Sequence, residues 1–563
     1  MKSRSKNPPT SFLQRHSRAM VIAGLALVIL LTAVERLRFL NVPLERDEGE
    51  YAYAGQLILR GFPPYLHAYN MKFPGVYAAY ALAMAVFGET IAGIRIGLLI
   101  VNAATILLVF LVARRLTEPL WALAAAASFA FLSFGEPVLG TFAHATNFVM
   151  LFAVAGSLTL LKGIDNERVW WLMTSGALFG IAVLMKQHGI FFILFAAGYI
   201  AWDEYRARNG SLRALTTKAA ALLLGAAIPL SLTALLLWRA GVFSKFWFWT
   251  FKYATNYVSE MPLSTGAHIF WVKVGEIAGA SIALWLLSGA GLIAIWGQAQ
   301  SREWRPFLVG LLLASFLAMV PGLYFRPHYF VLVLPALALL ISSALSWLSM
   351  FLSKRHMPIA SIALPISLFI IAFASAAYQQ GYFLFEVRPE QVSRVIYNAA
   401  AFPESVQVAE YIKSHTDRSD RIAVLGSEPQ IYFYSDRLSA TGYIYMYGLM
   451  ESHSYAEQMQ QEMINEIETT NPKYIVQVFA PGSWVARPFS PQLVFQWMKS
   501  FVKDNFDLVG VAEIISSEKT SYYWDKDAAA YARRSRDITD PLRQFPTVLV
   551  FRRKDATTAA PAG

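Results

Sequence analysis

Cysteine is absent from the 563 residues, and only 15% of the residues are charged. Without thiols the chain can form no disulfide, no cysteine-ligated zinc site and no thiol-based catalytic centre. So low a charged fraction, beside 56% hydrophobic residues, lies outside the usual range of soluble globular proteins. The composition therefore excludes cysteine chemistry and predicts a membrane protein.

A concentrated basic stripe is also missing, although the formal net charge is +11. The basic residues occur in short loops between apolar segments, as Arg114 and Arg115 do. Cytoplasmic loops of membrane proteins carry such an excess of Lys and Arg. The charge is therefore assigned to membrane orientation, and no nucleic-acid partner is predicted.

Apolar segments long enough to cross a bilayer as helices recur from Met20 to Tyr378. We expect eleven spans, near residues 20–40, 92–113, 119–134, 142–161, 170–186, 189–202, 218–239, 268–296, 306–323, 329–350 and 358–378. The basic N-terminus, with Lys2, Arg4 and Lys6, is predicted to be cytoplasmic, and an odd number of spans places the C-terminus outside. The chain is thus expected to be a multi-pass protein of the inner or plasma membrane.

Two domains are predicted, because the apolar character ends near Gln379. Residues 1–379 form the membrane domain, and its loop 41–91 belongs to the outer face; Pro74–Gly88 is too short for a span and should lie at the interface or be re-entrant. Residues 380–563 are expected to form an extracytoplasmic α/β domain with a mixed, mostly parallel sheet. Its expected strands are 421–426, 473–480, 506–514 and 546–553, and its expected helices 403–416, 455–470 and 490–504.

Four carboxylates, Glu45, Asp47, Glu48 and Glu50, stand together in LERDEGEYAYAG after the first apolar segment. A structural explanation is a helix start in which Asp47 and Glu50 form a capping box, with the helix ending at Arg60–Gly61. Capping leaves Glu45 and Glu48 unexplained. A functional explanation therefore remains open beside it.

In the same region an Asp-Glu pair after the first span is followed by EYAYAGQLILRG, by YNMKFPG and by FGET…GIR, which ends at Arg95. This order of motifs resembles the first outer loop of the GT-C fold glycosyltransferases. The sequence is most similar to the glycosyltransferase 39 group, with its protein O-mannosyltransferase-like, Rgt-like and aminoarabinose-transferase-like members. The resemblance covers about residues 20–380. This chain has Lys-Phe-Pro where the aminoarabinose transferases have Lys-Pro-Pro.

The resemblance implies a membrane glycosyltransferase. It would move a hexose or pentose from a polyprenyl-phosphate donor to a lipid, glycan or protein acceptor at the outer face, by an inverting route. It further implies that Asp47 is the catalytic carboxylate, with Glu48 as its neighbour, and that Lys72 faces the donor phosphate.

Breakage of the bond to phosphate develops negative charge, which fixed cations stabilise. The candidate donor-phosphate ligands are Lys72, Arg95, Lys186, Arg326 and His328. The candidate substrate-pocket residues are Glu50, Tyr51, Tyr69 and Tyr324. Anchoring at the membrane interface is the structural alternative for Lys186 and Arg326. An acceptor hydroxyl must lose a proton, for which Asp47 is the candidate base.

No metal site is predicted, because His144, Glu136, His188 and His328 have no ligand spacing on one helix. These side chains could nevertheless gather round a divalent cation. His144 lies where the related sequences often have an acidic residue.

Two aromatic stretches have open interpretations. Residues 243–257, FSKFWFWTFKYATNY, could stack on sugars but fit an amphipathic interfacial helix better. Residues 428–448 could cover the active site, hold an acceptor or simply pack on the membrane domain.

The alternative function is a transporter or lipid-handling protein whose charged outer loop is a gate. The candidate charges gather at one face instead of deep within the spans, which favours chemistry at the surface.

Overall fold

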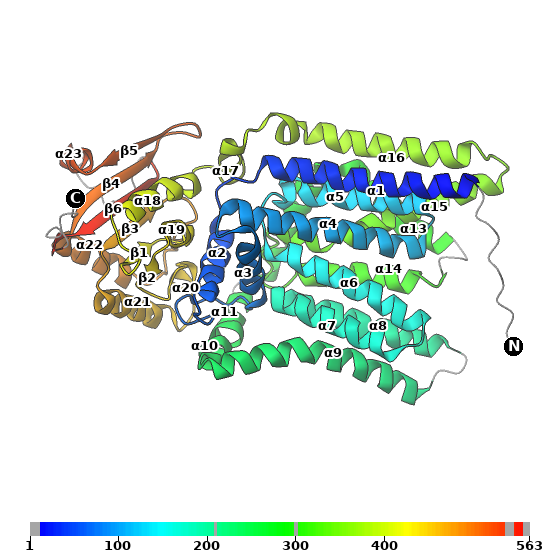
Figure 1. The fold of residues 1–563 in the computed structure, drawn as a ribbon, viewed down its shortest axis with the longest axis horizontal. Helices are drawn as coiled ribbons and strands as arrows, with labels where there is room; N and C mark the ends of the chain where they lie inside the picture. The colour runs from blue at the N-terminus through cyan, green and yellow to red at the C-terminus, as the bar shows by residue number, and fades with distance from the viewer. Residues whose placement is uncertain (1–11, 208–210, 260, 298–301, 535–544, 556–563) are drawn as a thin grey trace.

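In the computed structural model the chain is a bundle of long helices with an α/β domain on one end (Figure 1). The structure describes residues 12–207, 211–259, 261–297, 302–534 and 545–555. The basic residues Lys2, Arg4 and Lys6 lie outside the described residues. Helix α1 begins at the end of the bundle that is far from the α/β domain.

Every expected span corresponds to at least one helix of the bundle. These helices are α1 (Phe12–Arg38), α4 (Ile91–Leu116), α5 (Pro119–Phe134), α6 (Ala145–Asp165), α7 (Val169–Met185), α8 (Ile190–Arg206), α9 (Leu212–Arg239), α12 (Leu263–Gly279), α13 (Ile282–Gly297), α14 (Arg305–Met319), α15 (Leu334–Lys354) and α16 (Ala360–Gln379). Within the described residues, six helices (α1, α4, α6, α9, α15 and α16) are long and apolar enough to cross a membrane. The count of eleven spans stays a prediction, since α5, α7 and α14 are shorter apolar helices.

One expected span is not a single straight helix. Residues 268–296 contain the end of α12 and most of α13, which meet at a bend of 106°. The two helices are separated by Ala280 and Ser281, and Ala280 caps α12. The chain here is a broken span or a re-entrant loop.

Short elements fill the end of the bundle that faces the α/β domain. Helices α2 and α3 stand across the ends of the long helices, and α10 and α11 lie at the same end (Figure 1). Their bounds are α2 (Arg46–Leu59), α3 (Gly75–Phe87), η1 (Glu136–Val138), η2 (Gln187–Gly189), α10 (Phe243–Trp247), the π-helix η3 (Phe248–Tyr253), α11 (Ala254–Ser259) and η5 (Pro327–Leu332). The apolar segment Pro74–Gly88 is therefore a short helix beside α2.

The capping box of α2 differs from the predicted one. Glu45 is the N-cap residue: its carboxylate accepts from the backbone N–H of Glu48 at 2.8 Å, and the Glu48 carboxylate accepts from the backbone N–H of Glu45 at 3.3 Å. The prediction that Asp47 and Glu50 cap this helix is wrong. Both are thereby left available for other contacts. The predicted end is confirmed, because Arg60 is the C-cap.

The α/β domain contains the four expected strands and two others. Its helices are η6 (Tyr382–Glu386), α17 (Pro389–Tyr397), α18 (Phe402–Ser414), α19 (Gln430–Ser435), α20 (Tyr447–Met450), α21 (Ala456–Thr470), α22 (Leu493–Asn505) and α23 (Lys526–Arg534). Its strands are β1 (Arg421–Leu425), β2 (Leu438–Ser439), β3 (Tyr474–Phe479), β4 (Phe506–Ile514), β5 (Thr520–Trp524) and β6 (Thr547–Arg553), in the order β2-β1-β3-β6-β4-β5.

The expectation of a mostly parallel sheet is wrong. Strand β1 pairs in parallel with β2 and β3, but β6 is antiparallel to both β3 and β4, and β4 is antiparallel to β5. The reason is that β4 and β5 form a hairpin, after which the chain returns as β6 between β3 and β4. The sheet is mixed.

The α/β domain is held against α2 by buried polar contacts. Arg46 pairs with Glu428 at 2.9 Å and donates to the Ser427 carbonyl at 2.7 Å. A Cβ built on Gly49 would lie only 2.7 Å from the backbone nitrogen of Gln430, so the backbones approach too closely for a side chain. The helix that carries the acidic cluster therefore lies between the bundle and the domain.

Candidate active site

A cavity of about 800 Å³ lies where α2, the ends of the bundle helices and the α/β domain meet. Seven of the predicted site residues line it: Asp47, Tyr51, Tyr69, Lys72, Lys186, Arg326 and His328. Four predicted residues do not line it: Glu48, Glu50, Arg95 and Tyr324. The structure thus brings most of the candidates together and separates the rest from the cavity.

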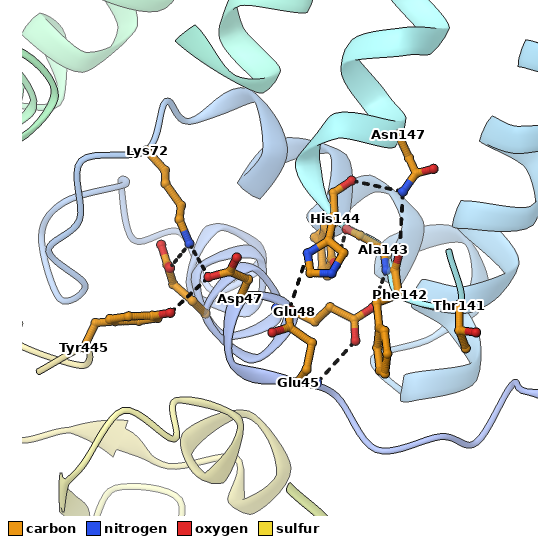
Figure 2. Close-up of polar contacts among 12 residues, drawn as sticks. Glu45, Asp47, Glu48, Lys72, Thr141, Phe142, Ala143, His144, Asn147 and Tyr445 are labelled. Atoms are coloured by element: carbon orange, nitrogen blue, oxygen red, sulfur yellow. Dashed lines mark hydrogen bonds and ion pairs between the residues drawn. The ribbon is translucent and has the colours of Figure 1, made fainter. Parts of the chain in front are cut away.

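Asp47 is the centre of a hydrogen-bonded group at the cavity surface (Figure 2). The Lys72 ammonium lies 2.8 Å from Asp47 and 2.7 Å from Glu50. Tyr77 donates to Glu50 at 2.6 Å, and Tyr445 of the α/β domain donates to Asp47 at 3.1 Å. Because two carboxylates neutralise its single charge, Lys72 is already paired before any phosphate enters.

The pKa of Asp47 reflects these neighbours. Burial by itself would raise it, but the Lys72 ammonium, with smaller contributions from His328 and His144, outweighs burial and holds it below its usual value. Asp47 is therefore a carboxylate across the physiological pH range. Lys72 is the reciprocal case: burial lowers its pKa, and the charges of Asp47 and Glu50 raise it well above the ordinary value.

Glu48 and Arg95 form a second ion pair, which is sealed behind the cavity surface. Their side chains are 0% and 3% exposed. The guanidinium binds both carboxylate oxygens and donates to the Thr141 carbonyl at 3.1 Å, and the Ala143 N–H donates to Glu48. This geometry gives no support to contact between either side chain and a substrate, and it gives both a structural role.

Glu50 and Tyr324 likewise act from outside the cavity. Glu50 is buried and holds Lys72 in place. Tyr324 lies beneath Arg326, whose guanidinium carbon is 5.5 Å from its ring centre. Both residues orient cavity side chains without lining the cavity themselves.

Lys186 and Arg326 bring positive charge to the cavity. The Lys186 ammonium lies 3.6 Å from the ring centre of Tyr329, and among the described residues no carboxylate lies within ion-pair distance of it. Burial lowers the pKa of Lys186 to about 7, and the nearby charges of Lys72 and Arg326 act in the same direction, while Asp47 opposes them. An anion bound beside this ammonium would restore its charge.

Two imidazoles stand beside Asp47. The rings of His144 and His328 are stacked with centroids 4.0 Å apart, and one ligand atom from each of Asp47, His144 and His328 lies within 4.8 Å of the others. Burial lowers the pKa of His144 to about 3, so its ring is neutral. A carboxylate and two neutral imidazoles are a donor set that suits a transition metal. This is the geometric candidate for the divalent cation that the sequence left open.

Of the other two candidates for a cation site, His188 lines the cavity and Glu136 does not. The His188 ring nitrogen contacts the Ala318 carbonyl at 2.6 Å. Neither belongs to the described group around Asp47.

Several cavity residues were not individual candidates, although most of them come from the two aromatic stretches, residues 243–257 and 428–448. Glu45 lines the cavity as well as capping α2, and Trp249 enters from the π-helix η3. Tyr443, Tyr445 and Tyr447 come from the α/β domain. Their alternation in YIYMYG is the one local signal for these tyrosines, since it indicates one face of an extended segment.

Residues 71–239 match the family model described as dolichyl-phosphate-mannose-protein mannosyltransferase. The match begins next to Lys72 and covers less than a third of the chain. No curated protein matches the chain in sequence.

The fold is similar to solved glycosyltransferase structures. ArnT from Cupriavidus metallidurans, bound to undecaprenyl phosphate, matches with a TM-score of 0.56 and 16% identity over 84% of this chain and 94% of ArnT. The archaeal oligosaccharyltransferase AglB from Archaeoglobus fulgidus, in complex with an inhibitory peptide and a dolichol-phosphate, matches with a TM-score of 0.51. The identity is 14% over 92% of this chain and 75% of AglB.

The arabinofuranosyltransferase AftD from Mycobacteria matches with a TM-score of 0.51 and 13% identity over 95% of this chain and 40% of AftD. At such identities the likeness establishes the fold. The chain is therefore a multi-pass membrane protein with the GT-C fold, and its α/β domain completes the cavity.

Proposed function

We propose that the chain is a glycosyltransferase that moves a sugar from a polyprenyl-phosphate donor to an acceptor hydroxyl. The observation that carries the proposal is the charge distribution of one cavity, which has the ionised Asp47 among its lining residues together with the cations Lys186 and Arg326. The polyprenyl phosphates bound in the ArnT and AglB structures support the class of donor.

In this proposal Lys186 and Arg326 bind the donor phosphate. When the bond between the anomeric carbon and the phosphate oxygen breaks, a phosphodiester with one charge becomes a monoester with more negative charge. Fixed cations at that position stabilise the transition state more than the bound donor. Lys72, which is paired with two carboxylates, acts chiefly by holding Asp47 and Glu50 together.

Asp47 receives the acceptor proton. The acceptor oxygen forms the new bond to the anomeric carbon from the side opposite the departing phosphate, so the configuration inverts. As that bond forms, the hydroxyl becomes strongly acidic, and even a carboxylate with a lowered pKa can take its proton. Lys72 and Tyr445 hold Asp47 in one orientation for this step.

The site is proposed to face the outside of the inner or plasma membrane. The cavity lies at the end of the bundle that bears the α/β domain, while α1 starts at the other end (Figure 1). With the N-terminus in the cytoplasm, the cavity and residues 380–563 are extracytoplasmic. The transporter alternative gains no specific support, because the charged cavity is at one end of the bundle.

The test uses purified protein in detergent, labelled polyprenyl-phosphate sugars and the cells' own envelope fraction as acceptor. We expect wild type to transfer label from at least one donor and Asp47→Asn to transfer it about 10²–10⁴-fold more slowly. If Asp47→Asn consumed the labelled donor at the wild-type rate, Asp47 would not be the base. Failure of folded wild type to bind any polyprenyl phosphate would refute the proposed function itself.

A further inference from the structure

A second hollow, of about 260 Å³, adjoins the main cavity on the side of helix α21. Its lining includes three aromatic side chains that also line the main cavity: Tyr69, Trp249 and Tyr443. We call these three residues the shared aromatic wall and the second hollow the outer groove. Because the two spaces have a wall in common, a ligand in the outer groove would lie directly beside the reaction cavity.

The shared aromatic wall is built from three distant segments. The rings of Tyr69 and Trp249 are stacked with centroids 5.6 Å apart, and Tyr443 stands perpendicular to Tyr69 at 5.1 Å. Tyr69 comes from the outer loop, Trp249 from the π-helix η3 and Tyr443 from the α/β domain. All three are more than 90% buried, and the Tyr69 N–H donates to the Gly442 carbonyl at 2.7 Å. The wall is therefore ordered by contacts of its own.

Residues 243–257 are helical throughout, as expected, but the middle of the segment is a π-helix. The segment is divided into α10, the π-helix η3 and α11. A π-turn widens the helix and often marks a functional site. Here it contributes both Phe248 and Trp249 to the outer groove, and Phe248 packs edge-on against Tyr455 at 5.3 Å.

Polar groups of both signs surround this aromatic surface. Lys245 donates to the Tyr69 hydroxyl at 2.8 Å, and Glu462 accepts from the Tyr443 hydroxyl at 2.7 Å. Among the described residues Lys245 and Glu462 do not form an ion pair with each other, so both line the groove with hydrogen-bonding capacity left. Ser244 and Gln458 add a hydroxyl and an amide.

This combination fits a saccharide. The C–H face of a sugar ring packs on aromatic rings, while its hydroxyls both donate and accept hydrogen bonds and so match a carboxylate, an amide and an ammonium together. An isoprenoid chain would offer no further hydrogen bond to Glu462 or Lys245, and a phosphate would be repelled by Glu462. Glu462 and Gln458 are exposed, so the groove is open and a chain longer than one sugar can extend from it.

We propose that the outer groove is the acceptor subsite and that the acceptor portion held there is a saccharide. This inference rests on the proposed function, because it places the reactive hydroxyl of that saccharide past Tyr443 and towards Asp47. Tyr445, two residues along the same segment, already donates to Asp47. The α/β domain would then select the acceptor, whereas the membrane domain binds the donor.

The test compares Glu462→Gln and Lys245→Met with the matched control Glu468→Gln. Glu468 lies on the same helix, but its carboxylate accepts from the Trp497 indole at 2.7 Å and does not line the groove. The probe is the water-soluble saccharide fraction released from the cells' envelope by mild acid. In transfer assays we expect the two groove variants to need about tenfold more saccharide for half-maximal rate, as befits the loss of a charged hydrogen bond.

Donor affinity and the maximal rate should stay unchanged in the groove variants, and Glu468→Gln should match wild type in every respect. Half-saturation equal to wild type in both groove variants would overturn the proposal. So would transfer that proceeds only to delipidated envelope proteins or to a lipid without sugar.

A second measurement separates this inference from the proposed function. Saturation-transfer NMR of the saccharide fraction with Asp47→Asn protein detects binding without turnover, and we expect a signal that Glu462→Gln reduces. If wild type transfers nothing but this signal is present, the proposed chemistry fails and the saccharide site stands. If no signal appears while transfer to the envelope fraction succeeds, the saccharide site is wrong and the transferase stands.

Discussion

Helix α2 carries two ion pairs from neighbouring residues, and they differ in almost every respect except sequence position. Glu48 faces the bundle and is sealed with Arg95, whereas Asp47 faces the cavity, where Lys72 and Tyr445 reach it. The Glu48 side chain is 0% exposed and that of Asp47 is 21% exposed. Adjacent residues on a helix point about 100° apart, so one acidic cluster can serve both stability and chemistry.

The comparison assigns stability to the sealed pair and activity to the open pair. Breaking a buried pair by removing one partner leaves an unpaired charge inside the protein. Changing a group at the cavity surface leaves water able to replace it. The assignment would be wrong if variants of the open pair lost stability, or if variants of the sealed pair lost activity alone.

Arg95→Ala should have the largest effect. Glu48 would stay buried without its cation, and the Thr141 carbonyl would lose a donor, so we expect a loss of about 3–5 kcal/mol in the free energy of unfolding. The measurement is the thermal unfolding temperature in detergent, or the folded yield where the protein does not accumulate. Arg95→Ala with the stability of wild type and a selective loss of donor binding would instead favour the phosphate role predicted from the sequence.

Asp47→Asn should leave stability near that of wild type and lower the rate of transfer by about 10²–10⁴-fold, the usual contribution of a general base. Thermal unfolding and single-turnover transfer on the same sample give the two quantities. The matched variant is Glu48→Gln, which keeps the shape of the Glu48 side chain and removes its charge. A larger loss of activity per degree of destabilisation in Glu48→Gln than in Asp47→Asn would reverse the roles of the two pairs.

The pH dependence of donor binding tests the cationic side of the cavity. Burial lowers the pKa of Lys186 to about 7, so the ammonium is charged below that pH and becomes neutral as the pH rises through it. A phosphodiester keeps one charge throughout, and its binding should weaken by about tenfold between pH 6 and pH 9. Asp47, Lys72 and Arg326 also face Lys186 but keep their charges over this range.

Lys186→Arg is the control, because an arginine stays protonated and should bind the donor with a flat pH profile. Donor binding that strengthens as the pH rises in wild type would show that another group governs it. So would a weakening with pH that remains in Lys186→Arg.

Chelation should have the smallest effect. The Lys72 ammonium already supplies the counter-charge of Asp47, so transfer should change less than twofold with EDTA, although Asp47, His144 and His328 could hold a cation. Metal analysis of the purified protein accompanies the assay. Loss of activity with EDTA and its recovery with one divalent metal, both absent in His144→Ala, would make Asp47 a metal ligand instead of the base.

The sequence contained enough to locate the acidic cluster, the end of α2 and four strands, because each depends on local periodicity and local turn chemistry. The start of α2 was misplaced by two residues. Aspartate is the better N-cap in isolation. Here Lys72 and Tyr445 bind the Asp47 side chain, and Glu45 is the N-cap residue instead. A tertiary contact decided between two locally acceptable caps.

The sequence marked residues 428–448 of the α/β domain as a segment that could cover the active site, but it did not show which side chains reach the acidic cluster. Tyr445 and Asp47 are 398 residues apart in sequence, and only the folded chain shows that the hydroxyl reaches the carboxylate. The parallel-sheet prediction failed for a related reason. Strand β5 is short and partly exposed throughout, so the hairpin that reverses the chain before β6 was missed.

The most direct test of the account follows the phosphorus atom. Wild-type protein in lipid vesicles is given a polyprenyl-phosphate sugar and the envelope fraction, and 31P NMR distinguishes the phosphodiester from the monoester. The account predicts that monoester appears in step with transferred sugar and that Asp47→Asn slows the formation of both by the same factor, about 10²–10⁴-fold. A donor that remains a phosphodiester while it changes leaflet, at the same rate in Asp47→Asn, would contradict the account and identify a lipid transporter.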